Sequence, residues 1–298
     1  MSSKTYDNGL SKQSVYYEDC INGMKNRVND NSIDLIVTSP PYWNVKDYGI
    51  DDQIGFDQSL DDYLDSMNKV LKECYRVLKE GRRMIINIRD IPVTSSVKGE
   101  ANRGNFYAIP LGAHIACEVL KSARFFNVGT IYWYKIGTCN AQCTNNAGIL
   151  GSYPYPPNAH IAFRIEYIFI FRKKDDVSSR PDKKMLVEKE KSRLTKEEWK
   201  EYTNQLWNFP GSHVEGHPAT FPLELPRRCI KLWSFAGETI LEPFLGTGTT
   251  LQACQHLNRN GIGFEICTKY EKIINARLSK ALTPEFIAFH TTKQNKVI

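Results

Sequence analysis

The sequence lacks any long hydrophobic run. No window approaches the ~18 consecutive apolar residues that a membrane-spanning helix needs, and the polar stretch 1–14 has no apolar core typical of a secretion signal. Neither membrane insertion nor secretion is therefore expected, which favours a cytoplasmic protein with no membrane partner. The 298 residues and 41% hydrophobic content are instead typical of a folded protein with one large domain or two modest ones.

Cysteine pairs with metal-ligand spacing are also absent. The eight cysteines are scattered, none forms a Cys-x-x-Cys pair, and only Cys139 and Cys143 lie close together. Since structural zinc sites place Cys and His at short fixed spacings, no metal is predicted, and reduced thiols are the default interpretation. The 39 Lys and Arg exceed the 33 Asp and Glu by six. This net charge of +6 permits a polyanionic partner without requiring one.

Short runs rich in β-branched and aromatic residues alternate with helical patterns over most of the chain. The clearest helix has apolar residues at steps of three and four from Leu60 to Leu78, after a Ser59 cap and before Gly81. The predicted strands are 33–37, 84–88, 128–134, 165–171, 239–241 and 262–264, and the other predicted helices are 110–121, 223–234, 249–258 and 268–281. This alternation predicts an α/β fold, with helices on both faces of a mainly parallel sheet.

Residues 172–202 depart from this alternation. They hold eleven Lys or Arg and eight Asp or Glu, a net charge of +3 and half that of the whole chain. The segment is typical of an insertion within an α/β unit. Two interpretations stay open, a solvated linker and helix, or a mobile basic element that contacts phosphates.

A glycine-rich turn follows the predicted strand 239–241. Residues 242–250 (EPFLGTGTT) run from that strand into a helix, which lets the backbone approach a ligand and directs helix N-terminal amides toward it. The third glycine of a dinucleotide fingerprint and the Gly-Lys-Ser/Thr of a phosphate loop are missing, so neither NAD nor ATP fits. Glu265 lies about 20 residues beyond the glycines at a strand end, where it could accept both hydroxyls of a ribose. A ribose-bearing cofactor without phosphate is predicted, with a merely structural tight turn as the alternative.

A second motif, residues 38–43 (TSPPYW), follows the predicted strand 33–37 directly. Two consecutive prolines cannot continue a strand or enter a helix interior. They therefore fix an extended backbone with an outward-facing carbonyl and two rigidly held aromatic side chains. The alternative is a Pro-Pro turn that packs Tyr42 and Trp43 into the core.

Together and in this order, the two motifs resemble those of the DNA amino-methyltransferases, specifically the β class, in which the catalytic motif precedes the cofactor motif. Further similar segments are 17–20, 47–49, 53–55, 76–81, 133–135, 166–167, 171–173 and 217–222. The resemblance implies a Rossmann-like methyltransferase fold with a mainly parallel seven-stranded sheet and a circularly permuted motif order. It further implies a catalytic half at 1–173, a target-recognition insertion at 174–210 and a cofactor-binding half at 211–298. Glu242 and Thr247 stand where the family usually has Asp and Ser, and both keep acceptor chemistry.

The resemblance implies a site-specific enzyme that transfers a methyl group from S-adenosylmethionine to the exocyclic amine of a base flipped out of duplex DNA. The Ser39 hydroxyl and the Pro40 carbonyl would accept the amine hydrogens, Pro41 would fix that carbonyl, and Tyr42 would stack on the base. In the family, Ser at position 39 usually accompanies cytosine N4 methylation, and an acidic or amide residue accompanies adenine N6 methylation. We therefore expect cytosine N4, with adenine N6 as the alternative. No Pro-Cys dipeptide occurs, which removes the usual nucleophile of carbon-5 methylation.

The same resemblance implies a set of cofactor residues. The methionine part is expected near Phe244 and the 217–221 segment, the ribose at Glu265 and the adenine near Asp19. The full predicted set is Asp19, Cys20, His217, Thr220, Phe221, Glu242, Pro243, Phe244, Gly246, Gly248, Thr249, Thr250, Glu265 and Ile266. Helix-cap or turn acids are the alternative for Asp19 and Glu265, and a structural role is the alternative for His217.

The expected partner is double-stranded DNA, within a restriction–modification system. The predicted DNA contacts are Trp43, Lys183, Lys184, Arg193 and Lys196, and the loops 92–109 and 137–160 have room for base contacts from Arg103, Asn105, Gln142 and Asn145. A companion endonuclease for the same site and a homodimer are both compatible with the sequence. Two other classes stay as alternatives, a non-catalytic nucleic-acid-binding module and an RNA or protein methyltransferase of the same fold. The intact motifs argue against the first.

Overall fold

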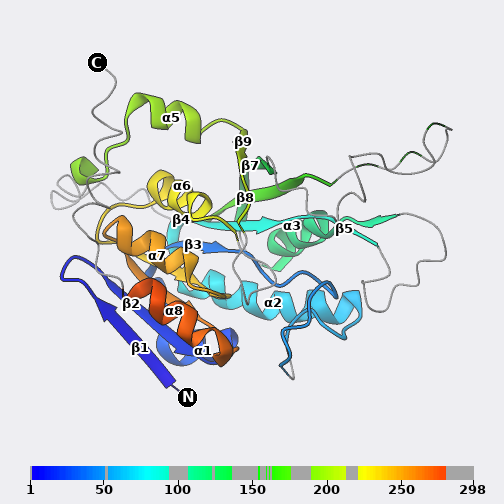
Figure 1. The fold of residues 1–298 in the computed structure, drawn as a ribbon, viewed down its shortest axis with the longest axis horizontal. Helices are drawn as coiled ribbons and strands as arrows, with labels where there is room; N and C mark the ends of the chain where they lie inside the picture. Colours follow the sequence, from blue (N-terminus) through cyan, green and yellow to red (C-terminus); the bar gives the residue numbers. More distant parts are fainter. Residues whose placement is uncertain are drawn as a thin grey trace.

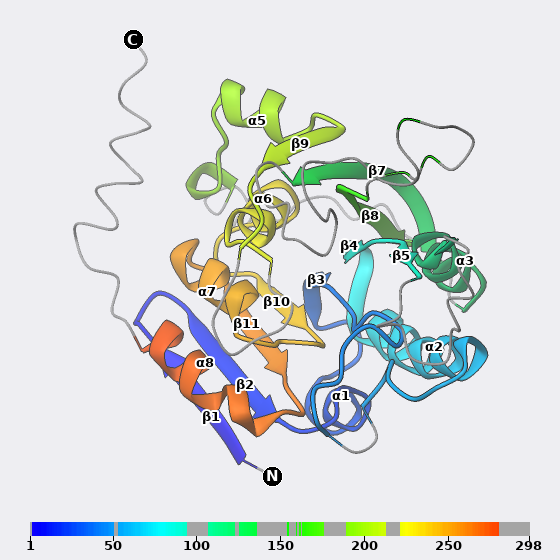
Figure 2. The same ribbon diagram turned by 45° about the vertical axis from the view of Figure 1, so that its right-hand side comes forward.

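The computed structural model describes residues 2–50, 53–93, 107–122, 125–135, 154, 159, 161, 163–175, 189–212 and 221–279. Within them, one large sheet has helices packed against both of its faces (Figure 1, Figure 2). The strands are β1 (Ser2–Asp7), β2 (Lys12–Tyr17), β3 (Ile33–Thr38), β4 (Leu78–Ile88), β5 (Ile91–Pro92), β6 (Ala108–Ile109), β7 (Phe125–Lys135), β8 (Ile165–Lys173), β9 (Leu206–Phe209), β10 (Thr239–Glu242) and β11 (Asn260–Phe264). The helices are α1 (Cys20–Arg27), α2 (Leu60–Val77), α3 (Leu111–Ser122), α5 (Lys196–Tyr202), α6 (Glu224–Trp233), α7 (Thr249–His256), the 3-10 helix η1 (Thr268–Tyr270) and α8 (Glu271–Leu278). None of these helices combines the length and apolar character that spanning a bilayer requires.

The large sheet follows the strand order β1-β2-β11-β10-β3-β4-β8-β7-β9. From β2 to β4 every pairing is parallel, whereas β8 runs antiparallel to both β4 and β7. The predicted α/β fold with a mainly parallel sheet is confirmed. In the described residues the sheet has nine strands rather than seven, because β1 and β9 extend its edges. β1 is polar and mostly exposed, and β9 has only four residues, so neither shows the hydrophobic run by which a strand is predicted.

The central strand β3 is buried on both faces. Ile36 packs in a core with α1, α2 and α3, whereas Leu35 and Val37 pack with α6 and α7 on the opposite face. All six residues of β3 are buried, as is typical of parallel strands between two helical layers. The strand therefore has a rigid position, and the residues that follow it emerge at its carboxyl end.

The predicted elements lie close to the observed ones. The six predicted strands correspond to β3, β4, β7, β8, β10 and β11, and the five helices to α2, α3, α6, α7 and η1 with α8. Ser59 caps α2, and its Oγ accepts a hydrogen bond from the Asp62 amide at 3.1 Å. The predicted end of α2 is wrong, because the helix stops at Val77 and the chain continues directly into β4. Gly81 has a φ of +71° at an irregularity in the β3–β4 pairing, and it does not end the helix.

The charged segment 172–202 begins inside the sheet. Lys173, the last residue of β8, is 5% exposed, and its ammonium donates to Asn31 Oδ1 at 2.8 Å and to the carbonyl oxygens of Tyr75 and Leu78 at 2.7 Å. Burial lowers the pKa of Lys173. The interpretation of this run as a solvated or phosphate-binding element is therefore wrong for Lys173, which joins the end of α2 to β8.

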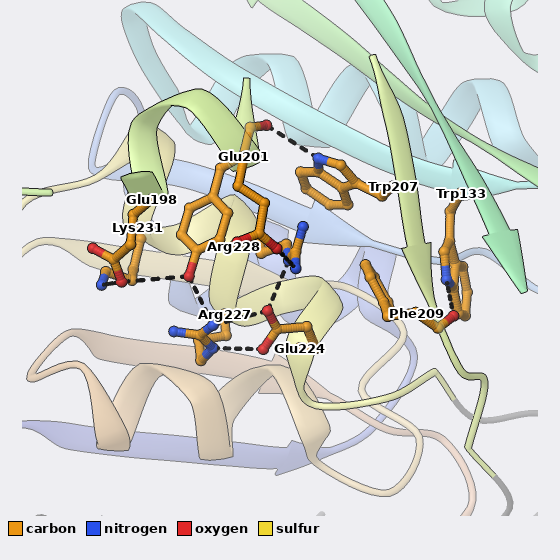
Figure 3. Close-up of polar contacts among 10 residues, drawn as sticks. Trp133, Glu198, Glu201, Trp207, Phe209, Glu224, Arg227, Arg228 and Lys231 are labelled. Atoms are coloured by element: carbon orange, nitrogen blue, oxygen red, sulfur yellow. Dashed lines mark hydrogen bonds and ion pairs between the residues drawn. The ribbon is translucent and has the colours of Figure 1, made fainter. Parts of the chain in front are cut away.

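Helix α5, at the end of the charged segment, and the strand β9 that follows it are packed against α6 (Figure 3). Arg228 of α6 is 7% exposed and forms ion pairs with Glu201 and Glu224, the latter at 2.7 Å. Its guanidinium carbon lies 4.8, 5.3 and 5.0 Å from the ring centroids of Tyr202, Trp207 and Phe209. Three residues of the predicted 174–210 insertion, Tyr202, Trp207 and Phe209, therefore belong to the packed core, whereas most residues between 196 and 209 are exposed. The role of the insertion in target recognition stays a prediction.

We expect Arg228→Met to lower the free energy of unfolding by about 1.5–3 kcal/mol, because it removes hydrogen bonds to two carboxylates in a buried setting. Arg193→Met is the matched control, since Arg193 is exposed and its ion pair with Glu190, three residues earlier, is exposed as well; its change should stay within about 0.5 kcal/mol. Equilibrium unfolding in urea measures both values. Equal, small changes in the two variants would show that the α5–α6 contact does not depend on Arg228.

Candidate active site

A cavity of about 440 Å³ lies at the carboxyl ends of the central strands. The chain leaves β3 through α2 toward β4, and it leaves β10 through α7 toward β11 on the other side. Because α2 and α7 pack on opposite faces of the sheet, β3 and β10 are neighbours at the point where the strand order reverses. Ligands of open α/β sheets bind in the crevice at such a point, and the volume of the cavity is in the usual range for ligand pockets.

The glycine-rich turn lies directly on the end of β11. The Leu245 amide donates to the Phe264 carbonyl at 2.8 Å, and a Cβ on Gly263 would lie 2.8 Å from the Leu245 side chain. Gly246 and Gly248 have φ values of +56° and +83°, in a region that favours glycine. Glycine at these positions thus allows the close approach of the turn to the strand. It also places residues 243–247 on the cavity wall.

Glu265 lies at the end of β11 and lines the cavity. Its side chain accepts hydrogen bonds from two backbone amides, Gly246 N to Oε2 and Cys267 N to Oε1, both at 2.7 Å. Burial raises the pKa of Glu265 to about 7, against the opposite effect of these two bonds. These two bonds agree with the alternative interpretation, in which Glu265 stabilises the turn. Each carboxylate oxygen still has a second acceptor site for a ligand.

Asp19 and Cys20 lie at the start of α1, on the cavity wall. Asp19 caps this helix, because its side chain accepts a hydrogen bond from the Asn22 amide at 2.9 Å. Cys20 is 5% exposed, and burial raises the pKa of its thiol well above the ordinary value. Asp19 therefore acts as a helix cap, as the alternative interpretation expected, and it also lines the cavity.

Glu242 does not line the cavity, which corrects its predicted contact with the cofactor. The residue is fully buried and accepts hydrogen bonds from the hydroxyls of Thr38 at 2.5 Å and Thr250 at 2.9 Å and from the Phe244 amide at 3.1 Å. Burial raises the pKa of Glu242 to about 8. The carboxyl group therefore joins the end of β3 to the glycine-rich turn and to α7.

Thr250 and Gly248 are also outside the cavity lining. Thr250 is 1% exposed and turned toward Glu242, and Gly248 is the N-cap of α7, where its Cα faces Ile274 of α8. Their predicted direct contact with a cofactor is not supported. The cofactor residues that do line the cavity are Asp19, Cys20, Phe221, Pro243, Phe244, Gly246, Thr249, Glu265 and Ile266. Their contact with a cofactor stays a prediction.

All four predicted catalytic residues, Ser39 to Tyr42, line the cavity. The Pro41 carbonyl accepts a hydrogen bond at 3.0 Å from the hydroxyl of Tyr63, a fully buried residue of α2. This bond fixes the backbone after β3 against the helix layer. The Tyr42 hydroxyl donates to Glu166 Oε2 at 3.3 Å, and burial raises the pKa of Tyr42 well above its usual value.

Trp43 is wrong as a predicted DNA contact. Its side chain is 4% exposed, packs in the core beneath α2, and donates its indole N–H to the Gln58 carbonyl at 2.9 Å. The alternative of a Pro-Pro turn that packs an aromatic ring into the core therefore holds for Trp43. It does not hold for Tyr42, which lines the cavity.

The cavity also has residues for which the sequence predicted no role. Lys135 at the end of β7 forms an ion pair with Glu166 of β8, and Arg89 follows β4 on the same wall. Glu166 lies beside Trp133 in the antiparallel pairing of β7 and β8. The segments 133–135 and 166–167 both resemble family segments. The sequence pattern does not show that they pair, because they lie about 30 residues apart.

The two basic candidates that the structure describes, Arg193 and Lys196, lie far from the cavity along the strand direction. The Ser192 hydroxyl accepts a hydrogen bond at 2.7 Å from the Ala236 amide, just before β10 begins, whereas the cavity lies where β10 ends. This position does not support their predicted DNA contacts. The remaining candidates lie outside the described residues, namely Lys183, Lys184, His217, Thr220, Arg103, Asn105, Gln142 and Asn145.

The family model for DNA methylases of the N6/N4 type matches residues 33–276. The chain therefore belongs to this DNA methylase family, and the predicted amino-methyltransferase resemblance is confirmed. Type II methyltransferase M.MjaI of Methanocaldococcus jannaschii is 31% identical over 279 residues, which cover 84% of this chain and 86% of the relative. M.MthZI of Methanothermobacter thermautotrophicus is 28% identical over 278 residues, covering 86% and 74%.

Solved structures agree with this assignment. A Thermus thermophilus protein, provisionally named a DNA modification methylase and complexed with S-adenosyl-L-methionine, has a TM-score of 0.71 and 30% identity, covering 91% of this chain and 94% of that chain. The cytosine-N4-specific PvuII DNA methyltransferase has a TM-score of 0.61 and 17% identity, covering 92% and 94%. The second likeness shows a shared fold.

Proposed function

We propose that this chain binds S-adenosylmethionine in the cavity between β3 and β10 and methylates the N4 amine of cytosine in duplex DNA. The observation that carries the proposal is the meeting of two motifs, about 200 residues apart in the sequence, in one cavity at the switch point. Ser39 to Tyr42 supply the side where a base would be held. The turn 243–247 and Glu265 supply the side for the cofactor.

The cofactor side fits S-adenosylmethionine chemically. The Glu265 carboxylate lies at the end of β11 with one acceptor site left on each oxygen, which suits the two hydroxyls of a ribose. Phe244 and Ile266 form an apolar part of the cavity wall, which suits an uncharged ring. The glycine-rich turn lacks the Gly-Lys-Ser/Thr sequence of a phosphate-binding loop. The Thermus thermophilus structure with this cofactor supports the assignment. When bound, the cofactor supplies an electrophilic methyl group.

The catalytic side suits an amine nucleophile. The Ser39 hydroxyl and the Pro40 carbonyl would accept the two amine hydrogens, which directs the nitrogen lone pair out of the base plane. Tyr42 would offer its ring to the flipped base. Cys20 is the described cysteine in the cavity wall, and burial raises the pKa of its thiol, which disfavours a thiolate nucleophile. The arrangement needs no covalent intermediate on the protein.

The choice of cytosine N4 over adenine N6 as the target rests on Ser39. Most adenine enzymes of the resembled family have an acidic or amide residue at this position. The named type II relatives support a place in a restriction–modification system, as the enzyme that protects a site from a companion endonuclease. The three-part division into 1–173, 174–210 and 211–298 belongs to the same proposal, with target recognition supplied by residues outside the motifs that resemble the family. A cytoplasmic location is consistent with this role.

Product analysis tests the proposed substrate. Incubation with S-adenosylmethionine and unmethylated genomic duplex, followed by nucleoside mass spectrometry, should yield N4-methylcytosine, because Ser39 stands where the resembled adenine enzymes usually have an acidic or amide residue. Ser39→Ala should retain cofactor binding and lose most methyl transfer. N6-methyladenine as the product would show that Ser39 does not select cytosine, and methylation of RNA or protein alone would contradict DNA as the substrate.

We expect the affinity for S-adenosylmethionine to depend on the ionisation of Glu265. Its pKa is raised to about 7, so the carboxylate protonates as the pH falls through 7 and loses acceptor strength toward the ribose. Calorimetric titration should therefore show weaker binding at pH 6 than at pH 8. Glu265→Gln should weaken binding at pH 8 by about 1.5–3 kcal/mol, the range for hydrogen bonds to charged groups, and remove the pH dependence. A dissociation constant unchanged by the substitution would leave Glu265 as a turn residue only.

A further inference from the structure

A buried ion pair forms part of the cavity wall on the side of β7 and β8. Glu166 is 5% exposed, and its Oε1 pairs with the ammonium of Lys135, which also lies 4.7 Å from the centroid of the Trp133 ring. Both charged residues line the same cavity as Ser39 and Tyr42. Because buried ion pairs add little net stability compared with apolar packing, their position beside a reaction site points to a use in the chemistry.

The other carboxylate oxygen of this pair is connected to the catalytic motif. Tyr42 donates its hydroxyl hydrogen to Glu166 Oε2 at 3.3 Å, and the Ser39 hydroxyl is close enough to the Tyr42 hydroxyl to lower the pKa of Tyr42. A distance of 3.3 Å is long for two oxygens, as is usual for catalytic hydrogen bonds before substrate binds. Ser39, Tyr42 and Glu166 therefore lie next to one another in the cavity wall.

The surroundings keep Tyr42 protonated. Burial and the nearby Glu166 charge raise the pKa of Tyr42 well above its ordinary value, while Arg89 and the Ser39 hydroxyl act in the opposite direction. The charged groups around these side chains are Lys135 at the end of β7, Arg89 after β4, Arg164 before β8 and Lys46 in the loop after β3, all in the cavity wall. Glu166 is the one carboxylate in contact with Tyr42 among the described residues.

Methyl transfer to an amine leaves a proton to be removed. In the proposed function, on which this step rests, the amine nitrogen forms a bond to the methyl carbon, and the carbon–sulfur bond breaks with its electron pair on sulfur. The nitrogen becomes positively charged and must lose a hydrogen. Side chains of the cavity wall can provide an exit for it.

We propose that this proton leaves through Ser39 and Tyr42 to Glu166. The amine hydrogen passes to Ser39 Oγ while the Ser39 hydrogen passes to the Tyr42 oxygen and the Tyr42 hydrogen passes to Glu166 Oε2. Ser39 and Tyr42 end as hydroxyls again, and the Glu166 carboxylate becomes a carboxylic acid. The Lys135 ammonium, whose side chain is 27% exposed, favours return of Glu166 to the ionised form by release of the proton to solvent. Glu166 acts through the two hydroxyls and is a positioning residue for them.

Single-turnover methyl transfer to duplex DNA, at saturating S-adenosylmethionine and from pH 5.5 to 9, tests this path. We expect Glu166→Gln and Tyr42→Phe each to slow the step by about 100-fold or more, the size of a general-base contribution. Tyr42→Phe keeps the ring that would stack on the base, so cofactor and DNA affinities should not change. The double variant should be no slower than the slower single variant, because the two residues act as a unit. The fall in wild-type rate at acidic pH should disappear in Glu166→Gln.

Two further variants separate this role from a structural one. Glu166→Gln with Lys135→Met avoids a buried unpaired ammonium, and it should fold and show the same slow, flat profile. Asp34→Asn removes another buried carboxylate, which pairs with Lys79 and Arg82 away from the cavity; its rate should stay within twofold of wild type.

Rates within threefold of wild type for Glu166→Gln or for Tyr42→Phe, or additive losses in the double variant, would overturn the path. An acidic limb that persists in Glu166→Gln would also overturn it. If folded wild-type protein methylates no duplex, the proposed function fails and the path fails with it. An active wild type with unaffected variants contradicts the path alone.

Discussion

The arrangement of the site depends on one buried carboxyl group. Glu242 accepts hydrogen bonds from Thr38 at the end of β3, from Thr250 in α7 and from the Phe244 amide, and it is fully buried. These contacts hold the strand that leads into Ser39 beside the turn that leads into Gly246. A carboxyl group satisfied by three donors is costly to replace, because each lost partner leaves a buried polar group without a hydrogen bond.

The strand order explains why this contact lies at the cavity. β3 and β10 are separated by about 200 residues in the sequence and are neighbours in the sheet, with crossovers that leave in opposite directions. The carboxyl ends of the two strands thus open into one crevice, in which Glu265 and Tyr42 stand on different walls. The DNA methylase family membership and the type II relatives agree with the proposed use of this cavity for a cofactor beside a flipped base.

The sequence predicts what local patterns determine. Continuous apolar runs predicted the buried strands, and the two motifs placed Ser39 and Gly246 at strand ends, because these features depend on neighbouring residues alone. The pattern could not show that Trp43 turns into the core while Tyr42 lines the cavity, since both are rigidly held aromatic residues beside prolines. It also could not show the Lys135–Glu166 pair or the buried Lys173, because these charges have partners only through strand pairing and helix packing. The charge pattern predicted an insertion, but it could not show that Arg228 packs against the last part of that segment.

Titration of S-adenosylmethionine into Glu242→Leu tests most directly whether the buried carboxyl group organises the cavity. Leucine has a similar volume and tolerates burial, so the variant should remain folded, with a thermal unfolding transition as the check. Because Thr38, Thr250 and the Phe244 amide lose their common acceptor, we expect the glycine-rich turn to shift and the dissociation constant to rise by about tenfold or more, the effect of ~1.4 kcal/mol. A folded Glu242→Leu protein with the wild-type dissociation constant would contradict the account.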